Sequence, residues 1–495
     1  MTKTLESIHA LVWGVPTLLL LLGVGVLLSV RLGFVQLRLL PRSMGDFFKK
    51  LRPGRSRDGQ VSSFQALCTA LAATVGTGNL VGVAGAICLG GPGAIFWMWV
   101  CGLLGMATKY AEVTLAIRYR VTVRGETLGG PMYLISRGMG RRWQPLAALY
   151  SFFGVIAAFG VGNATQINAV TEGIRGVAAG FGVPWQSWWS PVLGLGLALL
   201  VGAMLLGGAK RIGATAERLV PLAAGSYLLL CLFALYRCRR GVPAAFLSIW
   251  NGAFSPAAVT GGAIASGFTA LRVGCSRGIF TNEAGMGTAS MAHAAAEVRH
   301  PGEQGLMGIM EVFLDTHLIC TLTALVILSS EVPIPYGLDA GGRLTLDAFT
   351  RVCGAWAAPV LAGALCCFAF ATILGWGLYG LRCAQYLFGP GCRVPFALLQ
   401  SLTVVAAAVL GTGTVWLLSE TVNALMAIPN CLALAYLSPE LIRLTKEYER
   451  EIRQSAGGGT KCRFPSTQTA ASRHPCGNSI PTLWRRRKKE RKSII

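Results

Sequence analysis

Charged side chains are scarce in this sequence and make up only 13% of its 495 residues. A soluble domain carries about 25% charged residues, so the shortage argues for lipid as the solvent. The mean hydropathy of +0.56 agrees with that interpretation. The net charge is +23, but the basic residues fall in loops and in the tail rather than on one compact face. We therefore expect a lipid bilayer as the partner, and no nucleic acid.

Signatures of other protein classes are also missing. The fifteen cysteines include no CxxC pair and many lie inside apolar runs, which predicts buried free thiols rather than disulfides or a metal site. The five histidines have no metal-ligand spacing. No nucleophile accompanies the acidic residues, so we expect neither an enzyme nor a cofactor. No small-residue cleavage site follows the first apolar run, which is therefore interpreted as a retained span.

Long apolar runs are what the sequence has instead. A helix rises about 1.5 Å per residue, so about 20 apolar residues cross the hydrocarbon. This window predicts an all-α polytopic membrane protein with about eleven transmembrane helices. The predicted spans are 10–31, 64–89, 92–117, 147–172, 190–208, 217–236, 264–296, 306–330, 355–380, 395–413 and 417–437. The seventh is the weakest, because it contains Arg272, Arg277 and Glu283.

The positive charges of the loops fix the orientation of these spans. If the chain crosses eleven times, its four basic segments all lie on the same face of the membrane. They are 31–58, 118–142, 210–218 and the tail after Leu441. The positive-inside rule makes that face cytoplasmic. The N-terminus is then outside and the C-terminus cytoplasmic, in what we expect to be a bacterial inner (plasma) membrane. From about residue 454 onward Gly, Ser, Thr and Pro dominate, which predicts a disordered end.

The ten spans after the first divide into two halves of five. Because each half has an odd number of spans, the halves enter the membrane in opposite directions, as in the inverted repeats of many secondary transporters. The predicted organisation is an extra N-terminal helix with a cytoplasmic loop (1–63), a first repeat (64–240), an extracellular connection (241–263), a second repeat (264–440) and a basic, disordered tail (441–495).

The first helix of each half is rich in glycine near its middle. Residues 73–79 are Ala-Thr-Val-Gly-Thr-Gly-Asn, and residues 278–288 are Gly-Ile-Phe-Thr-Asn-Glu-Ala-Gly-Met-Gly-Thr. Each Gly costs about 1 kcal/mol relative to Ala in a helix interior, so both stretches favour an unwound backbone. Freed amides at a half-helix N-terminus suit a carboxylate, and freed carbonyls suit a sodium ion. Gly78 and Gly82 also have the GxxxG spacing of a helix-packing surface, and both interpretations stay open.

Acidic residues at membrane depth each need a reason, since a charge at the helix centre costs about 2.5–3.5 kcal/mol. Glu112 follows Lys109 and is expected to form a structural pair or to lie at the interface. Glu283 is expected to cap a half-helix or to pair with an arginine, with ion ligation as the alternative. Glu311 and Asp315 are four residues apart and share one helix face. We expect Glu311 near the interface and Asp315 deeper, with a proton or cation relay as one interpretation of Asp315 and not the favoured one.

Five long stretches occur in one order along the chain: ALCTALAATVGTGNLVGVAGAICLGGPGAIFWMWVCGLLGMATKYAEVTLAIRYR at 66–120, GGPMY at 129–133, KRIGATAERLVP at 210–221, RGIFTNEAGMGTASMAHAAA at 277–296 and EVFLDTHLICTLTALVIL at 311–328. Together they resemble the alanine/glycine:cation symporters, also called the sodium:alanine symporter family. The likeness covers about residues 10–450. Matches of this length and order are far more specific than any short motif.

This resemblance implies the LeuT-type fold, with five-plus-five inverted repeats after one extra helix. It implies cotransport of alanine, glycine or a similar small neutral amino acid with sodium, or less often with protons. It puts the substrate site on the two broken helices, here 76–79 and 280–285. Gln166, whose amide suits either helix packing or a zwitterion, matches a substrate-site glutamine. Thr372 and Trp376 match a segment that contributes to the substrate and cation sites.

The chain departs from the family in that last segment. The family commonly has Ser-Thr where this sequence has Ala371-Thr372, and Ser-Tyr-Tyr-Gly-Glu where it has Gly-Leu-Tyr-Gly-Leu at 377–381. The missing hydroxyl removes a candidate sodium ligand. The resemblance therefore leaves sodium and a proton both open as the coupling ion, and the exact substrate open as well.

We expect the site residues to divide between the amino acid and the cation. The predicted substrate-binding residues are Gly76, Thr77, Gly78, Asn79, Gln166, Phe280, Asn282, Thr372 and Trp376, and the predicted cation-binding residues are Ala72, Gly76 and Thr372. Amides around 77–79 are expected to bind the carboxylate. Carbonyls within 72–76 and the Thr372 hydroxyl are expected to hold the cation.

The remaining roles follow from the chemistry of an amino acid. Gln166 and carbonyls of the second broken helix are expected to take the ammonium group, while Trp376 and Phe280 limit the side chain. Closure of the site around both solutes then predicts secondary active symport by alternating access. No obligate protein partner is evident. A channel, a membrane enzyme and a non-transporting membrane sensor are the other classes considered.

Overall fold

The computed structural model describes residues 12–51, 61–264, 266–338, 341–409 and 412–456. Within those residues the regular structure is helical apart from one hairpin of two strands. The prediction of an all-α protein is therefore confirmed.

In the described part of the chain, seven helical segments are long and apolar enough to cross a membrane, or nine if each of two bent pairs is one span. The seven are α7 (Gly93–Arg118), Arg141–Gly180 with α9 (Gln144–Phe159) and α10 (Thr165–Gly180), α11 (Trp189–Leu206), α12 (Gly208–Arg237), Pro301–Ser329 with α17 (Pro301–Val312) and α18 (Thr321–Ser329), α20 (Ala357–Phe388), and Pro390–Ala408 within which α21 (Arg393–Val409) begins. The bent pairs are α5 (Ser63–Thr74) with Gly78–Gly90, and Thr421–Tyr436 of α22 (Thr412–Tyr436) with α23 (Ser438–Ala456).

Two of the predicted spans are shorter than a full crossing. The first is α2 (Val15–Arg31), with 17 residues. The weak seventh, predicted as 264–296, is α15 (Gly267–Asn282), then a non-helical stretch, then the short α16 (Ser290–His293). Neither part of this seventh segment is long enough to cross the hydrocarbon alone, because about 20 residues are needed.

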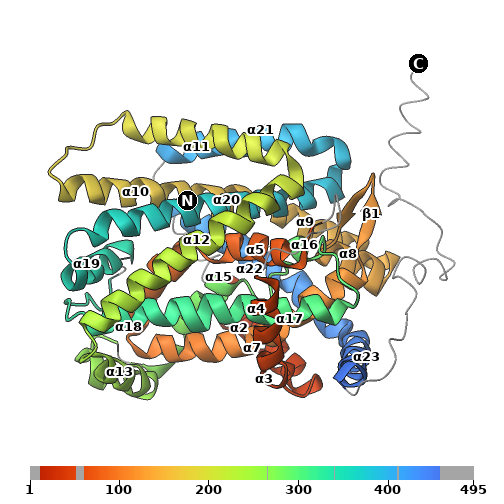
Figure 1. The fold of residues 1–495 in the computed structure, drawn as a ribbon, viewed down its shortest axis with the longest axis horizontal. Coiled ribbons are helices and arrows are strands. Elements are labelled where there is room, and N and C mark those ends of the chain that lie inside the picture. Colours follow the sequence, from red (N-terminus) through yellow and green to blue (C-terminus); the bar gives the residue numbers. More distant parts are fainter. Residues whose placement is uncertain (1–11, 52–60, 265, 339–340, 410–411, 457–495) are drawn as a thin grey trace.

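Corresponding helices of the two halves pack against each other. α7 contacts α17, α9 contacts α20 and α11 contacts α21, which are the second, third and fourth helices of each half. Figure 1 shows the long helices lying side by side, with α11 and α21 along one edge and α7 near the opposite one. Two halves with the same order of helices account for this pairing.

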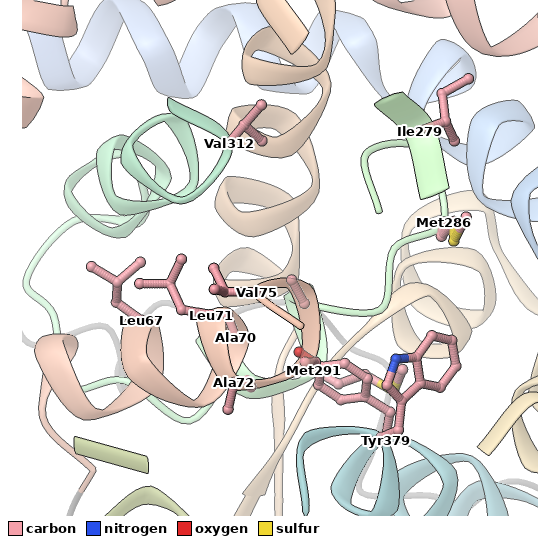
Figure 2. Packing of buried hydrophobic residues seen from close by; sticks show 14 of the residues in the cluster. Leu67, Ala70, Leu71, Ala72, Val75, Ile279, Met286, Met291, Val312 and Tyr379 are labelled. Atoms are coloured by element: carbon pink, nitrogen blue, oxygen red, sulfur yellow. The ribbon is translucent and has the colours of Figure 1, made fainter. Parts of the chain in front are cut away.

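The two interrupted helices meet inside one hydrophobic core. Leu71 and Val75 of the first and Ile279 and Met286 of the second are buried in the same cluster. Figure 2 shows Met286 on the non-helical stretch that follows Ile279, in the same region as Val75. The interruptions are therefore enclosed by protein, which is where irregular backbone is tolerated at membrane depth.

Several short elements lie between the long helices. They are α3 (Val35–Arg38), α4 (Leu40–Lys50), the strands β1 (Val121–Val123) and β2 (Glu126–Leu128), α8 (Pro131–Tyr133), η2 (Leu134–Met139), η3 (Arg141–Trp143), α13 (Val242–Phe254), α14 (Pro256–Thr260), α19 (Gly341–Cys353) and η6 (Pro390–Cys392). The strands pair in antiparallel register, Val123 opposite Glu126, across a turn in which Arg124 and Gly125 have φ of 52° and 78°. Positive φ at both positions is typical of a two-residue hairpin turn.

The boundary predicted for the tail falls inside a helix. α23 runs through Ser438–Ala456, so residues 441–456 are helical rather than disordered. Arg443 lies 2.7 Å from both Glu440 and Glu447 on this helix. Such pairs at spacings of three and four residues support a surface helix. The rest of the predicted tail, 457–495, lies outside the described residues.

Candidate functional site

The first interruption follows α5. This helix begins at a capping box, in which Ser62 Oγ accepts the N–H of Gln65 at 3.0 Å and Gln65 Oε1 accepts the N–H of Ser62 at 3.1 Å. It ends where Val75 adopts an extended ψ of 103°. A π-helical turn, η1 (Gly78–Gly82), and α6 (Val83–Gly90) continue the chain at an angle of 50° to α5. The predicted interruption at 76–79 is confirmed.

Asn79 satisfies part of the unwound backbone with its own groups. Its Oδ1 accepts the N–H of Gly76 at 2.8 Å, and its N–H donates to Gly76 O at 3.3 Å. The amide of Asn79, which we expected to be free for a carboxylate, therefore has an internal partner in this structure. Thr77 and Gly78 are buried beside it.

Thr372 brings α20 against the first interruption. Its Oγ1 donates to Ala72 O at 3.0 Å. A Cβ atom on Gly76 would lie 2.7 Å from the same hydroxyl oxygen, so only glycine fits there without a shift. The three residues predicted to bind a cation, from two distant parts of the sequence, are therefore adjacent and present oxygen atoms.

Gln166 lies just after another π-helical turn, η4 (Gly160–Ala164), and faces the same interruption. Its Oε1 accepts a hydrogen bond from Thr77 Oγ1 at 3.2 Å, and its Nε2 donates to Val161 O at 3.1 Å. The side chain thus joins two helices and lies next to the unwound residues. Both interpretations made from the sequence, helix packing and a site residue, fit its position.

The second interruption begins after Asn282, the last residue of α15. Glu283, Gly285 and Gly287 have φ of 54°, 93° and 77°. These left-handed values end the helix, and glycine adopts them without the steric cost that a side chain adds. Asn282 Oδ1 accepts the N–H of Ala284 at 2.9 Å, which closes the end of α15. The second predicted interruption is therefore present, but it begins at Glu283 rather than at position 280, because α15 is helical through Asn282.

The two interrupted helices touch at Gly78. A Cβ atom there would lie 3.1 Å from Thr281 Cγ2 and 3.7 Å from Phe280 Cδ1. At Gly82, one turn further on, the nearest such atom is 3.9 Å away. The GxxxG interpretation is thus compatible with an unwound segment, since the close approach of η1 to α15 requires the glycine at position 78.

Glu112 has a different partner from the one predicted. Its Oε1 accepts the N–H groups of Gly285 and Gly287 at 2.9 and 3.0 Å, and Asn430 Nδ2 at 2.8 Å. The residue is buried inside the protein. It does not pair with Lys109, but serves as the acceptor for the backbone of the second interruption.

Glu311 takes the lysine instead. Its Oε1 lies 3.3 Å from Lys109 Nζ, and its Oε2 lies 3.0 Å from His293 Nε2. All three side chains are fully buried, so Glu311 forms its ion pair inside the protein. Because the three come from α17, α7 and α16, this group fixes α16, beyond the second interruption, to the neighbouring long helices.

Trp376 is held by the second interruption. Its Nε1 donates to Glu283 Oε1 at 2.9 Å, and Thr288 Oγ1 donates to Glu283 Oε2 at 2.5 Å. The carboxylate thus accepts from an indole and a hydroxyl, where the sequence had suggested an arginine. On its other side Trp376 packs on Gly162 of η4, where an added Cβ would lie 2.2 Å from Trp376 Cβ.

Asp315 is a residue of this region that the predicted site did not include. A π-helical segment, η5 (Phe313–Cys320), begins between Glu311 and Asp315. Its wider turn separates two carboxylates that would share one face of an α-helix. Asp315 Oδ1 accepts Asn79 Nδ2 at 2.7 Å. The signal that identifies it is an ionisable residue at membrane depth, which is by default a candidate for function.

Comparisons with known proteins identify the family. The model of the sodium:alanine symporter family matches residues 1–461. A sodium/alanine symporter of Methanococcus maripaludis is 42% identical, over 91% of this chain and 97% of that protein. A putative sodium/proton-dependent alanine carrier protein of Bacillus subtilis is 36% identical, over 92% and 94% of the two chains.

A solved structure, that of MhsT in complex with L-phenylalanine, superposes with a TM-score of 0.51 and covers 79% of this chain and 99% of that one. The sequence identity is 14%, so this likeness concerns the fold alone, which is the LeuT type. The family match extends over nearly the whole length of the chain. The chain therefore belongs to the sodium:alanine symporter family.

Proposed function

We propose that this protein is a secondary active symporter that imports a small neutral amino acid, alanine or glycine, together with sodium. The observation that carries the proposal is that the two interrupted helices meet. They are closest at Gly78, where an added Cβ would lie only 3.1 Å from Thr281 Cγ2. Interrupted helices of this kind present half-helix ends to anionic groups and free carbonyls to cations.

The residue roles follow from which groups are adjacent. Backbone groups around Thr77 and Gly78 receive the carboxylate of the amino acid. Gln166 and carbonyls near Asn282 receive the ammonium group. Trp376 and Phe280 limit the size of the substrate's side chain. The 2.9 Å hydrogen bond from Trp376 Nε1 to Glu283 Oε1 supports this role, because it fixes the position of the indole.

The cation is assigned to the group formed by Ala72, Gly76 and Thr372. The hydroxyl oxygen of Thr372 and the carbonyl oxygen of Ala72 are 3.0 Å apart. If their hydrogen bond opens slightly, both oxygens can coordinate the same ion. Carbonyl and hydroxyl oxygens are the ligands that such sites offer to sodium. Occupation of both sites then favours closure, and one helix bundle rocks against the rest.

We further propose a multi-pass location in a bacterial inner membrane, with the N-terminus outside and the C-terminus cytoplasmic. The basic loops 31–58 and 118–142 support this orientation. No catalytic activity and no cofactor other than the coupling ion belong to the proposal.

A proton in place of sodium is the second candidate. Two observations favour it: Ala371 stands where the family commonly has a hydroxyl, and the Bacillus subtilis relative is named sodium/proton-dependent. A non-transporting sensor would bind the same amino acid without moving it.

The test is uptake into proteoliposomes that contain the purified chain. Labelled alanine, glycine and serine are supplied with an inward sodium gradient, an inward proton gradient or no gradient. Accumulation of alanine or glycine above the external concentration, driven by sodium, is expected. Accumulation driven by protons alone would favour the second candidate, and binding without accumulation would favour a sensor. Equilibration without a gradient requirement would indicate a channel.

A further inference from the structure

Three arginines lie close together where α12 ends and the chain turns into α13. Arg237 is the last residue of α12, and Arg239 and Arg240 follow in the turn before Val242 begins α13. All three residues are exposed. In the proposed orientation this turn lies outside, where the positive-inside rule predicts few basic residues. The proposed function gives these arginines no role, so their charge needs another explanation.

The charge of this arginine turn is not balanced by acidic side chains. Within the part of the chain that the structure describes, no carboxylate forms an ion pair with Arg237, Arg239 or Arg240. Arg239 lies instead over the ring of Tyr236, with its Cζ 5.0 Å from the ring centroid, and its Nη1 donates to Tyr236 O at 3.2 Å. Neither contact removes the positive charge, and a cluster of unbalanced cations attracts anions.

The backbone of the turn has a defined geometry. The N–H of Cys238 donates to Ala234 O at 3.0 Å, and the N–H of Gly241 donates to Cys238 O at 2.9 Å. Gly241 also lies against the end of α18, since an added Cβ would be 3.1 Å from Ser329 O. The three arginines therefore stand on a fixed support, which lowers the conformational entropy that a ligand would have to overcome on binding.

The helix α13 that follows has one face on the protein and one face away from it. Ala245 and Ile249 are buried in the same cluster as Ile95 and Met98 of α7. The exposed face carries large apolar residues at helical spacing, namely Phe246, Leu247, Trp250 and Phe254. With 13 residues, α13 is too short to cross the hydrocarbon. Its exposed face is therefore expected to lie at the membrane interface, where aromatic side chains are enriched.

Aromatic residues also flank the turn on the side of α12. Tyr236 is 66% exposed, and the ring of Phe233 lies 5.7 Å from that of Trp356, which is also exposed. Figure 1 shows α13 and α19 at the end of the molecule opposite to β1 and α23. Since aromatic belts mark the level of the lipid headgroups, the arginine turn lies at that level too.

Two simpler explanations account for only part of this surface. A cation in the last turn of a helix interacts favourably with the helix dipole, which explains Arg237 but not the two arginines beyond the helix. A soluble anion would use the charges and leave the apolar face of α13 without a role. An anionic phospholipid fits both features, because it has a phosphate for the guanidinium groups and acyl chains for the apolar face.

We propose that the arginine turn and the exposed face of α13 form a binding site for an anionic phospholipid in the leaflet at this end of the molecule. Arg237, Arg239 and Arg240 bind the phosphate of its headgroup, and the acyl chains lie against Phe246 and Trp250. The binding does not depend on transport. Only the assignment of this leaflet as the outer one rests on the proposed orientation.

The test is a titration of the purified chain in neutral detergent, with the melting temperature as the readout. Phosphatidylglycerol is compared with phosphatidylcholine and with glycerol 3-phosphate, which carries the anionic group without acyl chains. The test variant is Arg237→Gln/Arg239→Gln/Arg240→Gln. The matched control, Lys446→Gln/Arg450→Gln/Arg453→Gln, removes the same charge from exposed positions of α23, at the other end of the molecule.

We expect phosphatidylglycerol to stabilise the wild-type protein more than phosphatidylcholine does. The test variant should raise the half-saturating concentration of phosphatidylglycerol by at least about tenfold, because each basic residue near the headgroups contributes to the attraction. The control should stay near the wild-type value. Replacing the same three arginines by lysine keeps the charge and should recover part of the effect. High salt should weaken the difference, since it screens exposed charges.

A photoactivatable phosphatidylglycerol gives a local readout. Crosslinks mapped by mass spectrometry should fall within 233–254 and be lost in the test variant. If that variant does not fold, Arg240→Gln alone should lower the yield of these crosslinks.

Three outcomes would overturn the site. In the first, the test variant responds to phosphatidylglycerol as the wild type does. In the second, the control loses as much as the test variant, which would indicate an effect of net charge. In the third, glycerol 3-phosphate stabilises the protein as well as the lipid does, which would indicate a soluble anion.

Discussion

Glu112 Oε1 accepts the backbone N–H of Gly285 at 2.9 Å, so a side chain of an uninterrupted helix supports the interrupted one. The same oxygen accepts the N–H of Gly287, and both glycines have left-handed φ values. Unwinding a helix leaves amides without partners, and buried amides must find acceptors. Glu112 supplies one acceptor for two of them, which allows the second interruption to exist inside a core.

Replacing Glu112 by Ala should therefore destabilise the protein. The change leaves the N–H groups of Gly285 and Gly287 without their acceptor, while Asn430 Nδ2 keeps its bond to Gly285 O. Each buried unsatisfied group costs about 1–3 kcal/mol. Glu112→Gln, which keeps one oxygen, should cost less. Melting temperatures in detergent compare the two, and equal losses in both variants would contradict the capping role.

Gly78→Val should abolish alanine uptake while membrane insertion is retained. The new side chain would meet Thr281 where a Cβ alone is already 3.1 Å away, so the two interrupted helices are pushed apart. Gly82→Ala is the control, since its Cβ has 3.9 Å of space. Uptake assays on protein matched for amount in the membrane decide the matter. Normal uptake by Gly78→Val would count against a site between these helices.

Thr372→Ala should raise the sodium concentration needed for half-maximal uptake, by about tenfold, which corresponds to about 1.4 kcal/mol. The change removes the hydroxyl that lies 3.0 Å from Ala72 O. Thr372→Ser keeps this hydroxyl and should stay near the wild-type value. If neither variant alters the sodium requirement, the cation of this site is held elsewhere or is a proton.

Glu311→Gln should lower the free energy of unfolding by about 3–5 kcal/mol, because it leaves Lys109 as an uncompensated buried charge. The double variant Lys109→Met/Glu311→Met should be less destabilised than Glu311→Gln alone. Glu447→Gln breaks an exposed pair with Arg443 and should cost at most about 1 kcal/mol. Chemical or thermal unfolding in detergent measures all three. A double variant worse than the single one would show that the pair itself is a net gain.

The hairpin predicts a pH dependence outside the membrane. Burial alone would raise the pKa of Glu126, but hydrogen bonds and charges from Arg382 and Arg393 hold that pKa below its usual value. Glu126 Oε2 lies 2.8 Å from Arg382 Nη1. Since the folded pKa is below the unfolded one, about 4.3, the stabilisation is present above that pH and is lost as the pH falls through the folded pKa.

Glu126→Gln should accordingly lower the melting temperature at pH 7 and have little effect at the lowest pH that the protein tolerates. Glu447→Gln serves again as the exposed control. A difference between wild type and Glu126→Gln that stays constant with pH would exclude a role for the carboxylate charge.

Hydropathy and glycine content predicted the long helices and both interruptions, because these depend on local chain properties. Lipid requires about 20 apolar residues per crossing, and glycine weakens a helix wherever it stands. The segment predicted as the weakest span is the one that the structure divides into the short α15 and α16.

The partners of the buried carboxylates could not be predicted in the same way. Lys109 and Glu112 are near each other in sequence, yet each contacts residues from another half of the chain. Glu311 and Asp315 have helical spacing, but Asp315 lies in the π-helical segment η5 and the two carboxylates have different partners, Lys109 for Glu311 and Asn79 for Asp315. Tertiary packing decides such contacts, and hydropathy carries no information about it. The helix α23 was different. Its basic charge led us to predict a disordered tail, but the spacing of Glu440, Arg443 and Glu447 by three and four residues is typical of a helix.

The most direct measurement is equilibrium binding of labelled alanine to the purified protein, in sodium and in a sodium-free buffer of equal ionic strength. Wild type and Gly82→Ala should bind saturably only with sodium, while Gly78→Val and Asn282→Ala, one change in each interrupted helix, should lose that binding. Sodium-dependent binding of unchanged affinity in both of those variants would contradict a site formed jointly by the two interruptions.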